Sequence, residues 1–227
     1  MTQFAEKYPD VLRSLPATGW LSEQPLEFQM RMAMAGRWKT VPRGALLYAQ
    51  GDVPDAVFGL GAGQIDLVMP ISETEQVTVY RAGPGLWIGE SALLAEQIRM
   101  ITLSAATECR VFRIPAVAVR RHLAEHPEDW SCFFRLSHMN AKLTLRVHAE
   151  FVALPPRARF ARMLLRMAGR DGAVRATQEE LGRLTGMSRA AFRRAFGELI
   201  GSGALRTEYG AVRIVDPAAL ERVAQAD

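Results

Sequence analysis

Three arginines near the carboxyl end of the chain, Arg189, Arg193 and Arg194, are spaced so that one helix would present them together. At about 100° per residue they project from roughly one side of a helix over Ser188–Ile200. The apolar residues of this segment fall on the other side: Phe192, Ala195, Phe196 and Leu199. A guanidinium group is a planar fork that makes two hydrogen bonds at once to a phosphate or to the edge of guanine. The pattern therefore predicts a helix that lies in the major groove of duplex DNA.

The residues before this helix predict a second helix and a tight turn. Thr177 followed by Glu180 forms a capping box, which begins a helix. Gly186 supplies a left-handed backbone for the turn, Met187 points inward, and Ser188 caps the next helix. The segment is therefore interpreted as a helix-turn-helix, and the alternative is two helices that only pack together.

Two short strands are expected after the helices, over Ala204–Thr207 and Ala211–Val215, with a turn between them. Such a hairpin is typical of the wing in a winged helix-turn-helix. The expected DNA-contact residues come from the helix starts, the outer helix face and the wing: Thr177, Ser188, Arg189, Ala190, Arg193, Arg194, Arg206 and Tyr209.

Charge is distributed unevenly along the chain. Residues 154–227 contain 13 arginines and eight carboxylates, whereas residues 1–153 contain 15 basic and 16 acidic residues. A basic segment is typical of a module that binds phosphate groups, although an arginine-rich surface also arises from a GC-rich genome. The charge changes at Leu154-Pro-Pro156, which ends a helical pattern. We therefore expect a β-domain over residues 1–127, a long helix and hinge over 128–153, and a DNA-binding domain over 154–227.

The first half of the chain predicts an antiparallel β-domain. Between Thr40 and Ile114, β-leaning runs recur about every ten residues, with glycine-containing turns between them. Apolar spacing predicts a helix over Gln24–Trp38, and helices follow Pro115. The predicted fold class is α+β: an antiparallel, jelly-roll-like β-roll with flanking helices, a long helix, and the winged helix-turn-helix.

Composition excludes several classes of protein. With 49% hydrophobic and 23% charged residues, the chain is typical of a globular protein. No apolar run approaches the roughly 18 residues of a membrane span. Glu6, Lys7 and Pro9 stand where a signal peptide would be apolar, so we expect a cytoplasmic protein with no membrane partner. Cys109 and Cys132 form no CxxC, so buried thiols are expected rather than a disulfide, zinc or iron–sulfur site.

A long helix is predicted over Glu128–Phe151. Its residues at spacings of three and four form a seam: Phe133, Leu136, Asn140, Leu143 and Val147. A single asparagine in such a seam can fix the register and the oligomeric state. Two interpretations stay open, because the seam could pair with a second copy or pack on the chain's own β-domain.

In this order the three parts resemble the Crp/Fnr family of bacterial transcription regulators. The resemblance covers nearly the whole chain and rests on four motifs: Tyr48-Ala-Gln-Gly-Asp52, Gly85-Leu-Trp-Ile-Gly-Glu90, Arg135-Leu-Ser137 and Thr177–Arg194. It implies a homodimer of paired long helices, a palindromic operator with half-sites about 34 Å apart, and RNA polymerase as a further partner. Arg189 and Arg194 match family positions that contact guanine and a nearby base or phosphate. Ala190 replaces an acidic residue that contacts cytosine, so we expect a different base pair there.

The resemblance also implies a candidate effector site in the β-roll. In members that bind cyclic AMP, a glutamate holds the ribose and an Arg-Ser pair holds the phosphate. Gly89, Glu90 and Arg99 match, but Met100 stands at the serine position, and a thioether cannot donate to a phosphate oxygen. Thr144 is the hydroxyl nearest to the adenine-contacting position. No cofactor is certain: a degenerate cyclic nucleotide site and a structural Glu90–Arg99 ion pair both stay open.

The sequence gives little support for catalysis or for metal or haem binding. Motifs of an α/β-hydrolase, a phosphate loop or a zinc protease do not occur, so we expect no enzyme. The histidines are interpreted as solvated rather than as metal or haem ligands: His122, His126, His138 and His148. The predicted function is a sequence-specific, homodimeric transcription regulator, with or without a small effector in the roll. The alternative is a cyclic-nucleotide sensor whose C-terminal module contacts protein.

Overall fold

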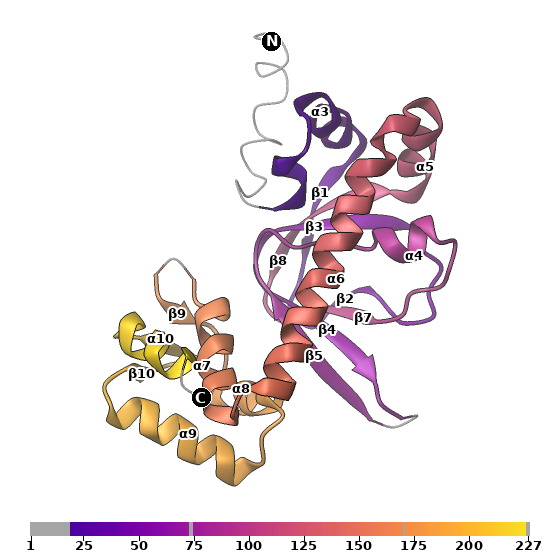
Figure 1. Ribbon diagram of the computed structural model, residues 1–227. Helices are drawn as coiled ribbons and strands as arrows, with labels where there is room; N and C mark the ends of the chain where they lie inside the picture. Colours follow the sequence, from indigo (N-terminus) through magenta and orange to yellow (C-terminus); the bar gives the residue numbers. More distant parts are fainter. Residues whose placement is uncertain (1–18, 73–74, 170, 226–227) are drawn as a thin grey trace. The chain divides into compact units, whose positions relative to one another are not determined.

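The computed structural model describes residues 19–72, 75–169 and 171–225 (Figure 1). The chain forms two compact units, residues 1–143 and 144–227. This division falls inside the long helix, whereas the change in charge and the two prolines predict a domain boundary at residue 154. The predicted domain ranges therefore stay a prediction. The segment Met1–Asp10, on which the expected localisation depends, lies outside the described residues. Each helix that the structure describes is too short or too polar to cross a bilayer.

Two antiparallel four-stranded sheets form the centre of the first unit, which confirms the predicted β-roll of an α+β fold. One sheet has the order β1 (Arg37–Val41), β8 (Cys109–Pro115), β3 (Ala56–Ala62) and β6 (Trp87–Ile88). The other has the order β2 (Leu46–Tyr48), β7 (Thr102–Ala105), β4 (Ile65–Pro70) and β5 (Gln76–Ala82).

Alternation along β3 places its side chains in two different cores. Phe58 and Leu60 lie between the two sheets, in a cluster that also contains Ile65, Leu103 and Val111. Their neighbour Val57 faces the other way, into a cluster beneath the helices. Successive side chains of a strand point to opposite faces, so a strand covered on both sides is apolar throughout.

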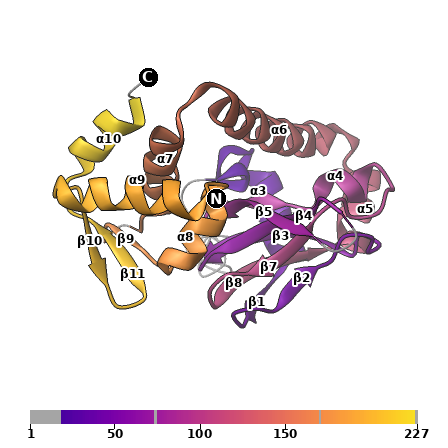
Figure 2. The same ribbon diagram turned by 90° about the horizontal axis from the view of Figure 1, so that it is seen from below.

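Helices cover the outer face of the β1-β8-β3-β6 sheet (Figure 2). The helical segments of this region are η1 (Trp20–Glu23), α3 (Leu26–Ala35), α4 (Glu90–Leu94), α5 (Ala116–Glu125), η2 (Pro127–Asp129) and α6 (Trp130–Ala153). The fully buried ring of Trp20 lies 5.5 Å from Phe28 and 5.3 Å from both Trp87 and Phe133, measured between centroids. Its Nε1 donates a hydrogen bond of 2.6 Å to the carbonyl of Cys132, which fixes the first turn of α6.

The structure corrects the predicted seam of the long helix. Phe133 and Leu136 are buried in the chain's own core, beside Trp20 and Trp87. Asn140 is half-buried and donates to the carbonyl of Trp87 at 3.1 Å. These three residues therefore cannot form an interface with a second copy. Of the two interpretations left open by the sequence, packing on the β-domain is the one that the structure supports for them.

Several element boundaries differ from the predictions. The helix expected over Gln24–Trp38 ends at Ala35, because the chain becomes extended at Gly36 and pairs with β8 from Arg37 onward. Strands β6 and β7 and the short α4 were not predicted. The long helix begins at Trp130, after a turn of 3-10 helix, and ends at Ala153.

The second unit contains the predicted helix-turn-helix and wing (Figure 1). Its elements are α7 (Pro156–Met167), β9 (Ala173–Val174), α8 (Gln178–Thr185), α9 (Arg189–Gly201), β10 (Leu205–Glu208), β11 (Ala211–Ile214) and α10 (Pro217–Gln225). The three strands form an antiparallel sheet in the order β10-β11-β9. Strand β9 and helix α10 were not predicted, although Leu220 and Ala224 of α10 are part of the core of this unit.

We expect Gly59→Ala to lower the free energy of unfolding by about 1–3 kcal/mol, because overpacking a filled core forces its neighbours apart. A Cβ at Gly59 of β3 would lie 2.7 Å from the indole of Trp87. Urea unfolding measures the effect. Gly83→Ala is the matched control, since a Cβ there meets no atom within 4 Å. Equal unfolding midpoints for the two variants would contradict this packing.

Candidate nucleic-acid interface and effector site

Local hydrogen bonds fix both helices of the helix-turn-helix. The Thr177 hydroxyl accepts from the backbone N–H of Glu180 at 3.2 Å, and the Glu180 carboxylate accepts from the backbone N–H of Thr177 at 2.8 Å. Gly186, at φ 63°, ends α8 in the left-handed region. Ser188 Oγ accepts from the backbone N–H of Ala191 at 3.2 Å and begins α9. The capping box and both caps are present as predicted.

An aromatic core sets the rotation of α9 about its axis. Phe192 and Phe196 are buried, with ring centroids 5.3 Å and 6.2 Å from that of Phe160 on α7. Leu199 continues the buried face, and half-buried Met187 packs against the same cluster. Because this face of α9 is held inside the unit, the opposite face is directed to solvent.

The solvent-directed face of α9 carries cations that have no protein partner. Arg189, Arg193 and Arg194 are exposed, and within the described parts of the chain none of them makes an ion pair or a side-chain hydrogen bond. Many other arginines of this unit bind carboxylates. Examples are the pairs Arg157–Glu198, Arg166–Glu150, Arg175–Asp171 and Arg183–Glu179. The unpaired guanidinium groups of α9 are thus available to an external anion, and phosphate is the anion they suit best.

The wing places one aromatic side chain in solvent at its tip. Tyr209 is fully exposed, between β10 and β11, and Gly210 has a φ of 68° in the turn. Arg206 is exposed, but its Nη2 lies 3.2 Å from Glu208, which also binds Arg213. Arg213, and to a smaller degree Arg206, hold the pKa of Glu208 below its ordinary value. Arg206 therefore differs from the α9 arginines, because it shares the Glu208 carboxylate with Arg213.

In the β-roll, the side chain of Arg99 is enclosed by the protein. It is 2% exposed, and its Nη1 and Nη2 donate to the carbonyls of Gly89 at 2.8 Å and Ala56 at 2.6 Å. The guanidinium carbon lies 4.1 Å from the centroid of the Tyr48 ring. Gly89, at φ 105°, makes room for it, because a Cβ there would lie 2.8 Å from Nη1.

Glu90 is 1% exposed and binds the long helix instead of Arg99. Its Oε1 accepts from Ser137 Oγ and from Asn140 Nδ2, each at 3.1 Å. Burial raises the pKa of Glu90, and its own backbone N–H, Asn140 and Ser137 oppose that shift only in part. The nearest carboxylate paired with Arg99 is Asp55, at 3.8 Å. Within the described residues the structural Glu90–Arg99 ion pair considered above is not formed.

Met100 and Thr144 are the remaining predicted effector residues. Met100 is 67% exposed, so it lies outside the enclosure that holds the neighbouring Arg99. Thr144 is exposed and belongs to the second unit, so its part in an effector site stays a prediction. Gly89, Glu90 and Arg99 lie together in the first unit. Sequence reasoning missed Ser137 and Asn140 as partners of Glu90, although the Arg135-Leu-Ser137 motif was a signal for the first of them.

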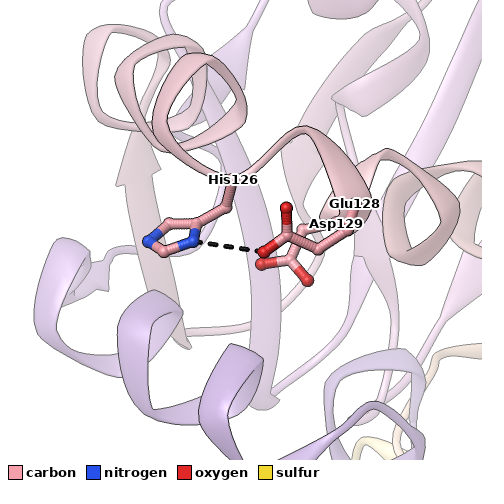
Figure 3. Close-up of side chains that lie close together, drawn as sticks. All are labelled: His126, Glu128 and Asp129. Atoms are coloured by element: carbon pink, nitrogen blue, oxygen red, sulfur yellow. Dashed lines mark hydrogen bonds and ion pairs between the residues drawn. The ribbon is translucent and has the colours of Figure 1, made fainter.

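A group of titratable side chains lies where α5 meets α6 (Figure 3). His126 Nδ1 is 3.3 Å from Glu128 Oε1, and the carboxylate of Asp129 lies close to both side chains. Asp129 Oδ2 is bound by Arg31 at 2.7 Å and by His122 Nε2 at 2.8 Å. Ion pairs account for this geometry. His122 is buried, which corrects the expectation that it is solvated, and burial lowers its pKa.

Both cysteines are buried free thiols, as expected. Burial raises the pKa of Cys109 and of Cys132, so neither thiol is activated toward oxidation or metal binding.

Two models of known protein families match this chain. Residues 38–126 match the family described as the cyclic nucleotide-binding domain, and residues 158–223 match the Crp-like helix-turn-helix domain. The chain belongs to the Crp/Fnr family. Of the two functions that the sequence leaves open, the DNA-binding transcription regulator is confirmed.

Individual relatives agree with this assignment over most of their length. The CRP-like cAMP-activated global transcriptional regulator of Mycobacterium tuberculosis is 26% identical over 193 residues, which cover 81% of this chain and 86% of that protein. A solved CRP-family regulator of Thermus thermophilus is 26% identical, with a TM-score of 0.63 over 83% of this chain and 97% of that one. A putative cAMP-binding regulatory protein of Silicibacter pomeroyi shares the fold, with a TM-score of 0.69 at 19% identity and coverage of 97% and 100%.

The candidate effector site of this Crp/Fnr regulator departs from the pattern that holds cyclic AMP. Met100 cannot donate to a cyclic phosphate, and two of the five N–H donors of Arg99 are bound to carbonyls, whereas its Nε has no hydrogen-bond partner among the described residues. Glu90 Oε1 is bound to two groups of α6, whereas its Oε2 is buried without a partner in the described part of the chain. A ligand that used Glu90 Oε1 would have to displace the hydrogen bonds to α6.

We expect Arg189→Ala and Arg193→Ala to weaken duplex binding in different ways. We expect loss of Arg189 to remove a base contact and to lower discrimination at one base pair by about 1–3 kcal/mol. We expect loss of Arg193 to remove a phosphate contact, so that binding weakens for every sequence and the slope of log K against log salt falls by about 1. Gel shifts over a range of salt concentrations measure both quantities.

Arg222→Ala is the matched control for these two variants, since it removes one exposed arginine from α10 rather than from α9. It should leave the sequence preference unchanged. If Arg189→Ala and Arg222→Ala behave alike on the operator, the assignment of α9 as the recognition helix is wrong.

We expect Glu90→Gln to become increasingly stabilising relative to the wild type as pH rises. The folded-state pKa of Glu90 lies above its ordinary value of 4.5. The folded wild type therefore retains a proton that the unfolded chain releases, and it loses stability as pH rises from 4.5 through the folded pKa. Glutamine keeps the acceptor and has no proton to release. Urea unfolding at stepped pH tests this, with the exposed Glu108→Gln as control, and a difference that shrinks with rising pH would refute it.

Proposed function

We propose that this regulator acts as a homodimer that binds palindromic duplex operators through two copies of α9. The observation that carries the proposal is the row of unpaired arginines on the outer face of that helix. A two-fold dimer presents two such faces, and half-sites about 34 Å apart match its symmetry. Selection of bound duplexes from a random pool tests the proposal, and enrichment of sequences without two-fold symmetry would contradict it.

A continuous exposed stripe along α6 supports the dimer. Its residues are spaced alternately by four and three: Phe134, His138, Ala141, Leu145, His148 and Val152. Phe134 is 76% and Leu145 68% exposed, which is unusual for large apolar side chains unless a partner covers them. At about 100° per residue, the stripe lies roughly 130° around the helix from the face that Phe133 and Leu136 bury. Such spacing is that of a coiled-coil seam, and a second copy offers the same stripe.

The operator contacts follow from the order of residues on α9. Arg189, in the first turn, is placed to reach guanine, whereas Ala190 offers only a methyl group. Arg193 and Arg194 lie further along the exposed face, where phosphates of the same groove would pass. Thr177 and Ser188 accept backbone N–H groups as helix caps, so each hydroxyl keeps its O–H to donate to a phosphate, beside the backbone N–H groups nearby. RNA polymerase is retained as a further partner because of the family.

We expect Leu145→Arg to prevent dimer formation and to lower operator affinity by at least about tenfold, because a charge in the seam must be buried without a partner. Analytical ultracentrifugation and gel shifts measure the two effects. Val117→Arg is the matched control: Val117 is similarly exposed, but it lies on α5, outside the stripe. A dimer of undiminished affinity in Leu145→Arg would rule out this seam.

A further inference from the structure

The polar contacts between the β-roll and the middle of α6 converge on one place, the junction of β6 and α4. Asn140 Nδ2 donates to the carbonyl of Trp87 and to Glu90 Oε1, both at 3.1 Å. Ser137 Oγ, one turn earlier on the same face of α6, donates to the same carboxylate oxygen at 3.1 Å. We call this arrangement of Glu90, Ser137, Asn140 and the Trp87 carbonyl the Glu90 clasp.

The clasp extends the apolar contact of α6 toward its carboxyl end. Phe133 and Leu136 bury the preceding turn against Trp20 and Trp87. Opening the clasp would remove both hydrogen bonds of Glu90 Oε1, and Glu90 is 1% exposed, so a carboxylate would be buried at a high cost. The clasp thus holds α6 against the roll through the protein's own groups.

We propose that the Glu90 clasp takes the place of a diffusible effector, so that this protein binds its operator without a nucleotide. The inference rests on the proposed function and names its regulation. A ligand controls a helix by making better contacts in one of two helix positions. Here Glu90 Oε1 supplies such contacts to α6 from within the protein, and two N–H groups of the neighbouring Arg99 are bound to the Gly89 and Ala56 carbonyls.

The coupling follows from where α6 leads. Residues of α6 from Phe133 to Asn140 contact the roll, and the exposed stripe of the same helix forms the proposed seam. The chain then continues through Leu154-Pro-Pro156 into the DNA-binding unit. A helix that is free to rotate on the roll would present its seam in more than one register. Fixing its rotation therefore selects one dimer geometry, and with it one spacing of the two α9 helices.

The test measures operator affinity of the full chain with and without cyclic AMP or cyclic GMP at about 1 mM, a concentration that would shift any site of micromolar affinity. We expect the dissociation constant of the wild type to change less than about twofold with either nucleotide. Glu90→Ala and the double variant Ser137→Ala/Asn140→Ala should each weaken operator binding by about tenfold or more. Glu90→Gln should bind nearly as the wild type does, because its amide oxygen accepts from both donors.

Two further measurements separate a positioning role from a loss of fold. Lys142→Ala changes an exposed residue of α6 outside both the clasp and the stripe, and should match the wild type. Amide hydrogen exchange over residues 137–143 should be faster in Glu90→Ala than in Glu90→Gln, at a temperature where both have native circular dichroism. Ser137→Ala alone, which removes one hydrogen bond, should give an intermediate affinity if the double variant does not fold.

The outcomes distinguish this inference from the proposed function. If a nucleotide tightens operator binding of the wild type by about tenfold or more, the clasp is no substitute for an effector, and the dimeric regulator stands. If Glu90→Ala binds the operator as tightly as the wild type without nucleotide, the inference is overturned in the same way. If the wild type enriches no duplex with or without nucleotide, the proposed function itself fails.

Discussion

The position of the long helix depends on one buried aromatic group, the indole of Trp20. Three other rings surround it, and its N–H donates to the first turn of α6. A buried indole N–H needs an acceptor, so this contact fixes both the depth and the rotation of the helix. One face of α6 is consequently committed to the β-roll, and another is left for solvent or a second copy. The clasp follows from that rotation, and the proposed seam uses the face that it leaves exposed.

Local signals allowed the DNA-binding unit to be predicted closely, whereas the roll-to-helix contact required the structure. Thr177, Gly186 and Ser188 act within a few residues of themselves, so their caps and turn can be recognised from spacing. Phe133 and Phe134 are adjacent and equally apolar, and nothing in their spacing says which one meets the core. That choice depends on Trp20, which is 112 residues away from its partner Cys132. His122 was misjudged for a related reason, because it is buried by packing and binds Asp129, which a second element holds through Arg31.

The same distinction explains the two arginine-rich regions. Composition reveals how many cations a segment contains, but only packing reveals which of them are already neutralised. In the second unit Glu150, Asp171 and Glu208 bind neighbouring arginines and offset part of their positive charge. Within the described residues the three α9 arginines have no carboxylate partner, so their positive charge is not offset. In the roll, Arg99 shows the opposite case, a matching family position whose guanidinium is bound to backbone carbonyls.

Trp20 is far in sequence from the residues of α6 that it contacts, and this separation affects how the chain folds. The cluster that contains Trp20, Phe28 and Phe133 cannot close until nearly the whole first unit has been synthesised. Contacts between such remote segments form slowly, because a long loop must be ordered first. A chain that stopped before α6 would lack Phe133 and Leu136 and would expose the part of the apolar cluster that they cover, as a site for aggregation. The long helix is thus also the cover that completes the roll during synthesis.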